Sequence, residues 1–173
     1  EPRLLEAKQA ALGFIESAIK PRDRAAVITF NDRPTLSAKF TSDLLTLAAG
    51  LTGLKAERGT SLYDTIVFSL FYFNGVKGQR ALLLLSDGKD EGSRFTYEDT
   101  LDFARRAGVA IYTIGVDIAR KEWETRRVLN RFADETGGRA YFVKTAAELP
   151  VIYQEIEKEL RSRYLLAYQS SNT

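Results

Sequence analysis

Hydrophobic positions along the chain follow two alternating patterns. In the first, apolar residues recur every three or four positions, which predicts amphipathic helices. In the second, short runs of consecutive apolar residues predict strands that are buried on both faces. The helical pattern covers 3–19, 41–54, 61–74, 96–108, 123–136 and 145–160, and the strand pattern covers 24–30, 80–86, 109–116 and 139–143. An alternating segment at 35–40 predicts an edge strand, and 164–169 is a further candidate strand.

Helices that alternate with doubly buried strands predict an α/β fold, with a mostly parallel sheet covered by helices on both faces. The "NDRP" turn (31–34) joins two strands as a hairpin and adds one antiparallel edge strand. We expect residues 1–163 to form one domain and 164–173 to be an exit strand or linker toward a following region. In such sheets ligands bind beyond the carboxyl ends of the strands, where the strand order reverses.

Composition narrows the kinds of site that the chain can hold. Its 173 residues are 45% hydrophobic, which is enough for one sizeable core. Cysteine and histidine are absent, which excludes disulfides, thiolate or imidazole zinc sites and Ser-His-Asp triads. The net charge of +2 is too small to indicate nucleic acid by itself, and no apolar run is long enough to span a bilayer. Because methionine is also absent, we expect the sequence to be a piece of a longer protein.

The stretch "LLLLSDGKDEGS" (82–93) places carboxylates directly after a buried strand. Asp87 is the first residue beyond that strand, so it is expected to face the crevice at the carboxyl edge of the sheet. An aspartate in this position suits a hard cation, bound directly or through water. For Lys89, Asp90 and Glu91 the simpler interpretation is that their side chains are solvated.

The stretch "RGTSLYD" (58–64) precedes a helix. A helix start, with Ser61 as the N-cap and Asp64 three residues later, accounts for both residues without a functional role. Thr60 is not needed for that role, and the glycine before it permits close approach of the backbone to a ligand. Its hydroxyl is therefore a second candidate metal ligand, expected on the same rim as Asp87.

The order of these segments resembles that of the von Willebrand factor type A domain family, in its bacterial form, over essentially the whole chain. The segments that carry the resemblance are "RLLEAKQAALGFI", "DRAAVITFND", "FTSD", "RGTSLYD", "SDG", "GVAIYTIGV", "ADETGGRAYFV" and "YLLAY". The resemblance implies a Rossmann-like doubly wound sheet with strand order 3-2-1-4-5-6. It also implies a non-enzymatic adhesion or interaction domain that is exported, either extracytoplasmic or secreted.

Members of this family typically bind a protein ligand through Mg²⁺ or Mn²⁺ at a metal-ion-dependent adhesion site, where an Asp or Glu carboxylate of the ligand completes the metal shell. By resemblance, Thr60 corresponds to the family's threonine ligand. Asp87 corresponds to the aspartate of its Thr-Asp-Gly turn, with Ser86 in place of the threonine. The family's Asp-x-Ser-x-Ser loop and the strand before it have no counterpart in this sequence. Either that segment lies outside this sequence, or the domain is a divergent one without the metal site; we favour the first, and we expect the metal site only when the upstream segment is present. We therefore expect strands 24–30 and 80–86 not to pair directly, and to lie about 10 Å apart, twice the normal strand spacing.

Two other classes of function fit the sequence. One is a metal-free interaction scaffold, in which basic pairs such as Arg105-Arg106 contact an acidic partner. The other is a Mg²⁺-dependent phosphoryl-transfer or receiver-type domain, although the chain has no Gly-x-x-x-x-Gly-Lys loop and no Asp-x-Asp pair at a strand end. Nucleic acid is not an expected partner, since "FSLFYF" (68–73) fits core and helix packing better than a base-stacking surface.

Overall fold

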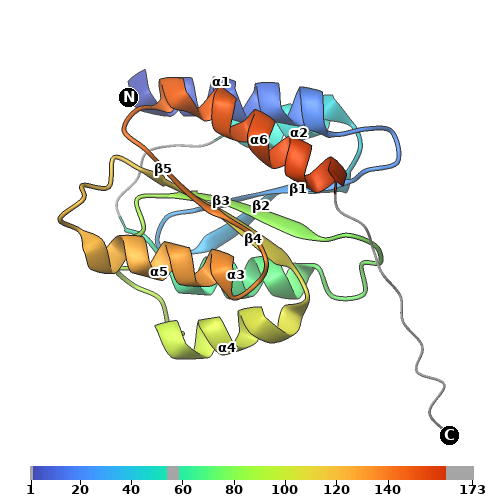
Figure 1. The fold of residues 1–173 in the computed structure, drawn as a ribbon. Coiled ribbons are helices and arrows are strands. Elements are labelled where there is room, and N and C mark those ends of the chain that lie inside the picture. Colours follow the sequence, from blue (N-terminus) through green and yellow to red (C-terminus); the bar gives the residue numbers. More distant parts are fainter. Residues whose placement is uncertain (1, 54–58, 163–173) are drawn as a thin grey trace, which may run out of the picture.

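The computed structural model describes residues 2–53 and 59–162 (Figure 1). The candidate strand 164–169 lies outside these residues. The helices are α1 (Pro2–Ala18), α2 (Leu44–Thr52), α3 (Leu62–Tyr72), α4 (Tyr97–Ala107), α5 (Trp123–Asp134) and α6 (Leu149–Ser162), and a 3₁₀ turn, η1 (Ala146–Glu148), leads into α6. The strands are β1 (Ala25–Phe30), β2 (Pro34–Thr41), β3 (Ala81–Ser86), β4 (Ala110–Val116) and β5 (Ala140–Val143).

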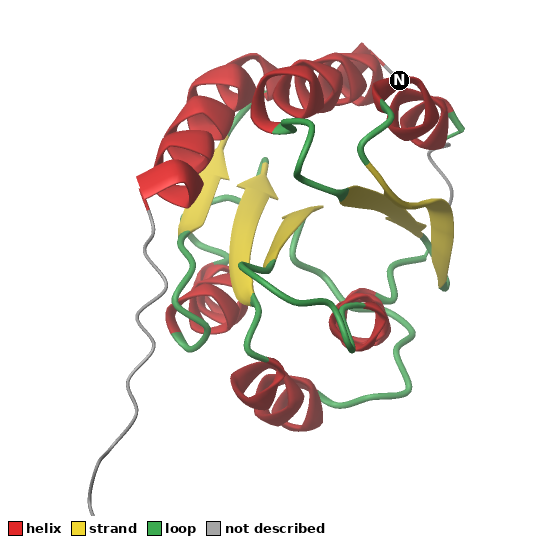
Figure 2. Cartoon of the chain, turned by 90° about the vertical axis from the view of Figure 1, so that its right-hand side faces the viewer, coloured by secondary structure: helices red, strands yellow, loops and turns green. Residues whose placement is uncertain are grey.

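The strands form a central layer between two layers of helices, which confirms the predicted α/β class. Helices α1, α2 and α6 cover one face, and α3, α4 and α5 cover the other (Figures 1 and 2). Leucines of β3 contribute to both faces, because Leu84 packs with α3 and α4 while Leu83 packs against the cluster around α6. The uninterrupted apolar run of β3 is explained by these two covered faces.

The strand layer has two parts that are not paired with each other. Strands β3, β4 and β5 form a parallel sheet, with Ala81 opposite Ala110 and Thr113 opposite Ala140. Strands β1 and β2 form an antiparallel pair, with Val27 opposite Ala38. Within the described residues β1 and β3 do not pair, which confirms that segments 24–30 and 80–86 are not directly paired.

Several helix ends follow the expected local rules. The Thr96 side chain accepts a hydrogen bond from the Asp99 backbone N–H at 3.1 Å and so caps α4. Gly108 ends that helix in the left-handed conformation, with φ of 64°, which a residue without a Cβ adopts easily. A capping box formed by Thr145 and Glu148 opens η1, so the helical pattern predicted from 145 begins with this 3₁₀ turn and continues as α6.

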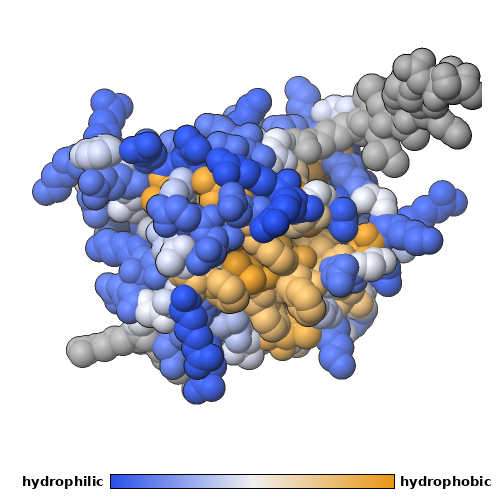
Figure 3. Space-filling view, turned by 90° about the horizontal axis from the view of Figure 1, so that it is seen from below, coloured by the Kyte–Doolittle hydropathy of each residue, from blue (hydrophilic) through white to orange (hydrophobic). Residues whose placement is uncertain are grey.

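Helix α3 is apolar on its outer face as well as on its buried face. Ile66 and Leu70 are buried, whereas Phe68 and Phe71 are exposed, Phe71 to 65%. Figure 3 shows apolar side chains gathered on the helical face of the molecule that is seen from below. The expectation that "FSLFYF" serves core packing is therefore wrong for these two phenylalanines.

The turn between α5 and β5 packs tightly against β4. The Thr136 hydroxyl accepts the Ile111 backbone N–H at 2.9 Å, and the Gly138 N–H bonds to the Ala133 carbonyl at 2.9 Å. A Cβ added at Gly138 would overlap the backbone carbonyl of Ile111. Position 138 therefore has no room for a side chain.

We predict that Gly138→Ala lowers the free energy of unfolding by about 3 kcal/mol or more, because the clash is with backbone that cannot rotate away. Gly13→Ala is the matched control, since a Cβ there meets nothing within 4 Å on the exposed side of α1. This control is expected to stabilise the protein by up to about 1 kcal/mol. Urea unfolding measures both changes, and equal stabilities for the two variants would contradict the packing described for position 138.

Candidate functional site

Backbone hydrogen bonds bring three loops together at one edge of the strand layer. The Asn31 carbonyl, directly after β1, accepts the Ser61 N–H at 2.7 Å. The Thr60 carbonyl accepts the Glu91 N–H at 2.8 Å. The loops after β1, before α3 and after β3 therefore lie side by side. We call this edge the rim.

The two predicted metal ligands come from adjacent loops of the rim. Thr60 is half-buried and Asp87 is exposed. Oδ1 of Asp87 accepts the Lys89 N–H at 3.1 Å. The buried Ser86 hydroxyl accepts the Gly88 N–H at 2.9 Å. The turn after β3 is therefore held by its own side chains, with Asp87 on its solvent side.

Asp90 has a structural role that the sequence interpretation missed. Its half-buried carboxylate accepts the Tyr63 N–H at 3.1 Å, the Ser93 N–H at 3.3 Å and the Ser93 hydroxyl at 2.6 Å. The expectation of a merely solvated side chain is wrong for Asp90, whereas Lys89 and Glu91 are indeed exposed. A carboxylate is well suited to this place, because it binds free N–H groups in the first turn of α3.

The start of α3 also differs from the expected capping arrangement. The Ser61 side chain does not cap the helix, and its hydroxyl donates to the Asn31 carbonyl at 3.1 Å instead. Asp64 accepts the backbone N–H groups of Arg94 and Phe95 at 2.8 and 3.1 Å. Both side chains therefore hold neighbouring loops in place rather than closing the helix end. The sequence offers no local signal for this role, because the bonded groups are about thirty positions away.

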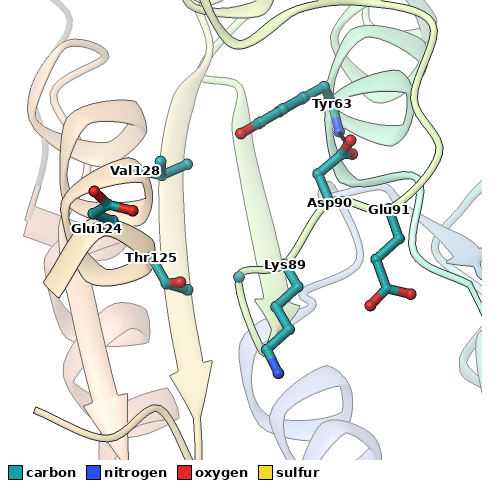
Figure 4. A pocket seen from close by; sticks show the side chains of 8 residues that line it. Tyr63, Lys89, Asp90, Glu91, Glu124, Thr125 and Val128 are labelled. Carbon is teal, nitrogen blue, oxygen red and sulfur yellow. Dashed lines mark hydrogen bonds between the residues drawn. The ribbon is translucent and has the colours of Figure 1, made fainter. Parts of the chain in front are cut away.

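Two hollows lie beside the turn that follows β3. One has a volume of about 370 Å³ and lies between this turn and α5. In Figure 4, Glu124, Thr125 and Val128 of α5 line it from one side, and Tyr63 and Asp90 from the other. Burial, and after it the nearby Asp90 carboxylate, raises the pKa of the Tyr63 phenol.

The second hollow, of about 360 Å³, is lined by Asp87, Asp117 and Glu122, among others. Asp117 follows β4 and has a φ of 57°, a left-handed conformation that is uncommon for a residue other than glycine. Its N–H bonds to the Val143 carbonyl at 2.9 Å, which fixes the end of β4 against β5. In the ranges that the structure describes, no cluster of three or more His, Cys, Asp or Glu side chains is arranged to hold a metal ion.

We predict that Asp90→Ala lowers the free energy of unfolding by about 2–3 kcal/mol, because it leaves the N–H groups of Tyr63 and Ser93 without their charged acceptor. Glu91→Ala is the matched control, since that side chain is exposed and, among the residues that the structure describes, only its backbone is given a hydrogen bond, from its N–H to the Thr60 carbonyl. The control should stay within about 0.5 kcal/mol of the native protein. Denaturant unfolding measures both, and a comparable loss in the two variants would argue against the role given to Asp90.

Comparison with known proteins identifies the family. The profile of the von Willebrand factor type A domain matches residues 1–155. Integrin alpha-M of Mus musculus is 31% identical over 99 residues, which are 55% of this chain and 9% of that protein, so the chain spans only a small part of this relative. A von Willebrand factor type A structure from Catenulispora acidiphila has a TM-score of 0.77 at 17% identity, covering 91% of this chain and 38% of the other. An aerotolerance-related membrane protein from Bacteroides fragilis has a TM-score of 0.71 at 17% identity, covering 93% and 89%. The chain belongs to the von Willebrand factor type A domain family, whose members typically serve protein interaction and adhesion.

Proposed function

We propose that this domain is a non-enzymatic protein-binding module that uses a divalent cation, Mg²⁺ or Mn²⁺, at the rim. Thr60 and Asp87 are the ligands that this chain contributes, and the protein partner adds an Asp or Glu carboxylate. The observation that carries the proposal is the hydrogen bond from the Glu91 N–H to the Thr60 carbonyl. This bond holds the Thr60 loop beside the segment that begins with Asp87. A single site shared by the two residues requires that their loops be neighbours.

The chemistry of the two side chains fits the proposed ion. Mg²⁺ and Mn²⁺ prefer oxygen ligands in an octahedral arrangement. Thr60 offers a neutral hydroxyl. Asp87 offers a carboxylate of which, within the described residues, only Oδ1 is hydrogen-bonded. Two ligands do not fill an octahedron, and one carboxylate does not neutralise the ion, so the remaining positions and charge suit further oxygen donors, including a carboxylate of the partner.

Exported or cell-surface location is part of the same proposal. One fold relative is described as a membrane protein and another as a pili tip protein of Porphyromonas gingivalis. No helix in the described ranges is both long enough and apolar enough to cross a bilayer. Binding of a surface partner is the role we propose for such a location.

We predict that Mn²⁺ binds the full chain at the rim and that Asp87→Ala weakens this binding by about tenfold or more, because it removes the charged ligand. Paramagnetic Mn²⁺ is the probe, since it broadens nearby amide signals even when binding is weak. The signals of residues 59–61 and 86–89 should broaden first. Thr60→Ala should also weaken binding, by a smaller factor because its hydroxyl is neutral.

Glu91→Ala serves as the control for this titration. It removes an exposed carboxylate from the same loop without removing a proposed ligand. Equal Mn²⁺ affinity in the native protein and Asp87→Ala would reject the metal role and favour the metal-free scaffold. Magnesium-dependent release of phosphate from small phosphate esters would instead favour a phosphoryl-transfer domain, because a binding module has no turnover.

A further inference from the structure

The turn that follows α3 exposes an asparagine–glycine pair, Asn74 and Gly75. The Asn74 N–H bonds to the Phe71 carbonyl at 2.9 Å, and the Val76 N–H bonds to the Phe73 carbonyl at 2.9 Å. These two bonds close the turn, and both residues of the pair lie on its exposed side. Solvent therefore reaches the Asn74 side chain and the peptide bond that follows it.

The two groups of this pair that can react with each other are both free. Among the described residues, none is hydrogen-bonded to the Asn74 carboxamide, and none accepts the Gly75 N–H. Gly75 has a φ of 79°, and a Cβ added there would meet nothing within 4 Å. A glycine has no side chain to shield its own nitrogen, so the approach to the Gly75 nitrogen is open.

We propose that Asn74 is a covalent modification site, at which the carboxamide is converted to a carboxylate with water as the only co-reactant. The Gly75 nitrogen loses its proton to water and attacks Cγ of Asn74. The bond between that nitrogen and Cγ forms, the bond between Cγ and Nδ2 breaks, and Nδ2 takes up a proton and leaves as ammonia. The product is a cyclic succinimide, and no atom is oxidised or reduced.

Water opens this ring in two ways. Addition at Cγ breaks the new bond to the Gly75 nitrogen and gives aspartate at position 74. Addition at the main-chain carbonyl carbon breaks the original peptide bond instead, so that the chain continues through Cγ as isoaspartate. Either product adds one negative charge and lowers the net charge of +2 by one.

The other asparagines lack this combination of features. Glycine follows only Asn74 in the sequence. Asn130 lies within α5, and its side-chain amide donates to a backbone carbonyl of that helix at 2.9 Å. Asn31 is half-buried, and its carbonyl is bonded to the loop before α3. Asn172 lies outside the described residues. Asn130 and Asn31 are therefore internal controls for reaction at Asn74.

The modification alters the end of α3 in charge and in geometry. A carboxylate at position 74 lies at the C-terminal end of the helix, where negative charge opposes the helix dipole. An isoaspartyl linkage also lengthens the main chain between Phe73 and Val76, whose hydrogen bond closes the turn. The same carboxylate lies three positions after the exposed Phe71, so the apolar outer face of α3 gains an acidic end.

The test is to age the full chain in mildly alkaline buffer, digest it and compare its asparagine peptides by mass spectrometry. We expect the peptide with Asn74 to exchange its amide NH₂ for OH. The peptide with Asn130 should react about tenfold more slowly or less, because its side chain must first leave its hydrogen bond and its helix. Asn74→Gln is the conservative control, since its longer side chain must close a larger ring. It should abolish the charge change seen by ion exchange.

The products and the folded state decide between the outcomes. Isoaspartate at position 74, with faster amide exchange at Val76, supports the ring route. Aspartate alone would mean direct hydrolysis of the amide and would overturn it. Equal rates at Asn74 and Asn130, or an unchanged Asn74 after ageing, would overturn the proposal. Reaction at Asn74 in urea but not in buffer would do so too, because it would show that the folded turn keeps the nitrogen and Cγ apart.

Discussion

Apolar packing by α1 and α3 keeps the two parts of the strand layer opposite each other. No strand pairing among the described residues joins β1 to β3, so their relative position depends on helices that contact both. Helix α1 does this through Leu12 and Phe14, and α3 through the cluster that contains Phe30 and Leu82. Side-chain packing is less directional than a ladder of hydrogen bonds, so the rim also needs the tie between Thr60 and Glu91 to fix its loops.

The rim is built by backbone groups and buried acceptors more than by its candidate ligands. The carboxylates of Asp64 and Asp90 accept hydrogen bonds from backbone N–H groups of neighbouring segments. Asp87 accepts one local bond and stays exposed. The carboxylates of Asp64 and Asp90 therefore hold the loops of the rim together, whereas that of Asp87 remains accessible to a ligand.

The sequence predicted the helices and strands well because their signals are local. The Thr96 cap, the Gly108 stop and the leucine run of β3 depend on residues that lie within one element. The split of the strand layer was also predictable, from the family resemblance combined with the spacing of strands. Roles that depend on distant partners were missed. Asp90 bonds to Tyr63, and Ser61 to Asn31, and in each pair the partners are brought together only by the fold. The exposed Phe68 and Phe71 were missed for a related reason, since an apolar residue carries no sign of whether another element covers it.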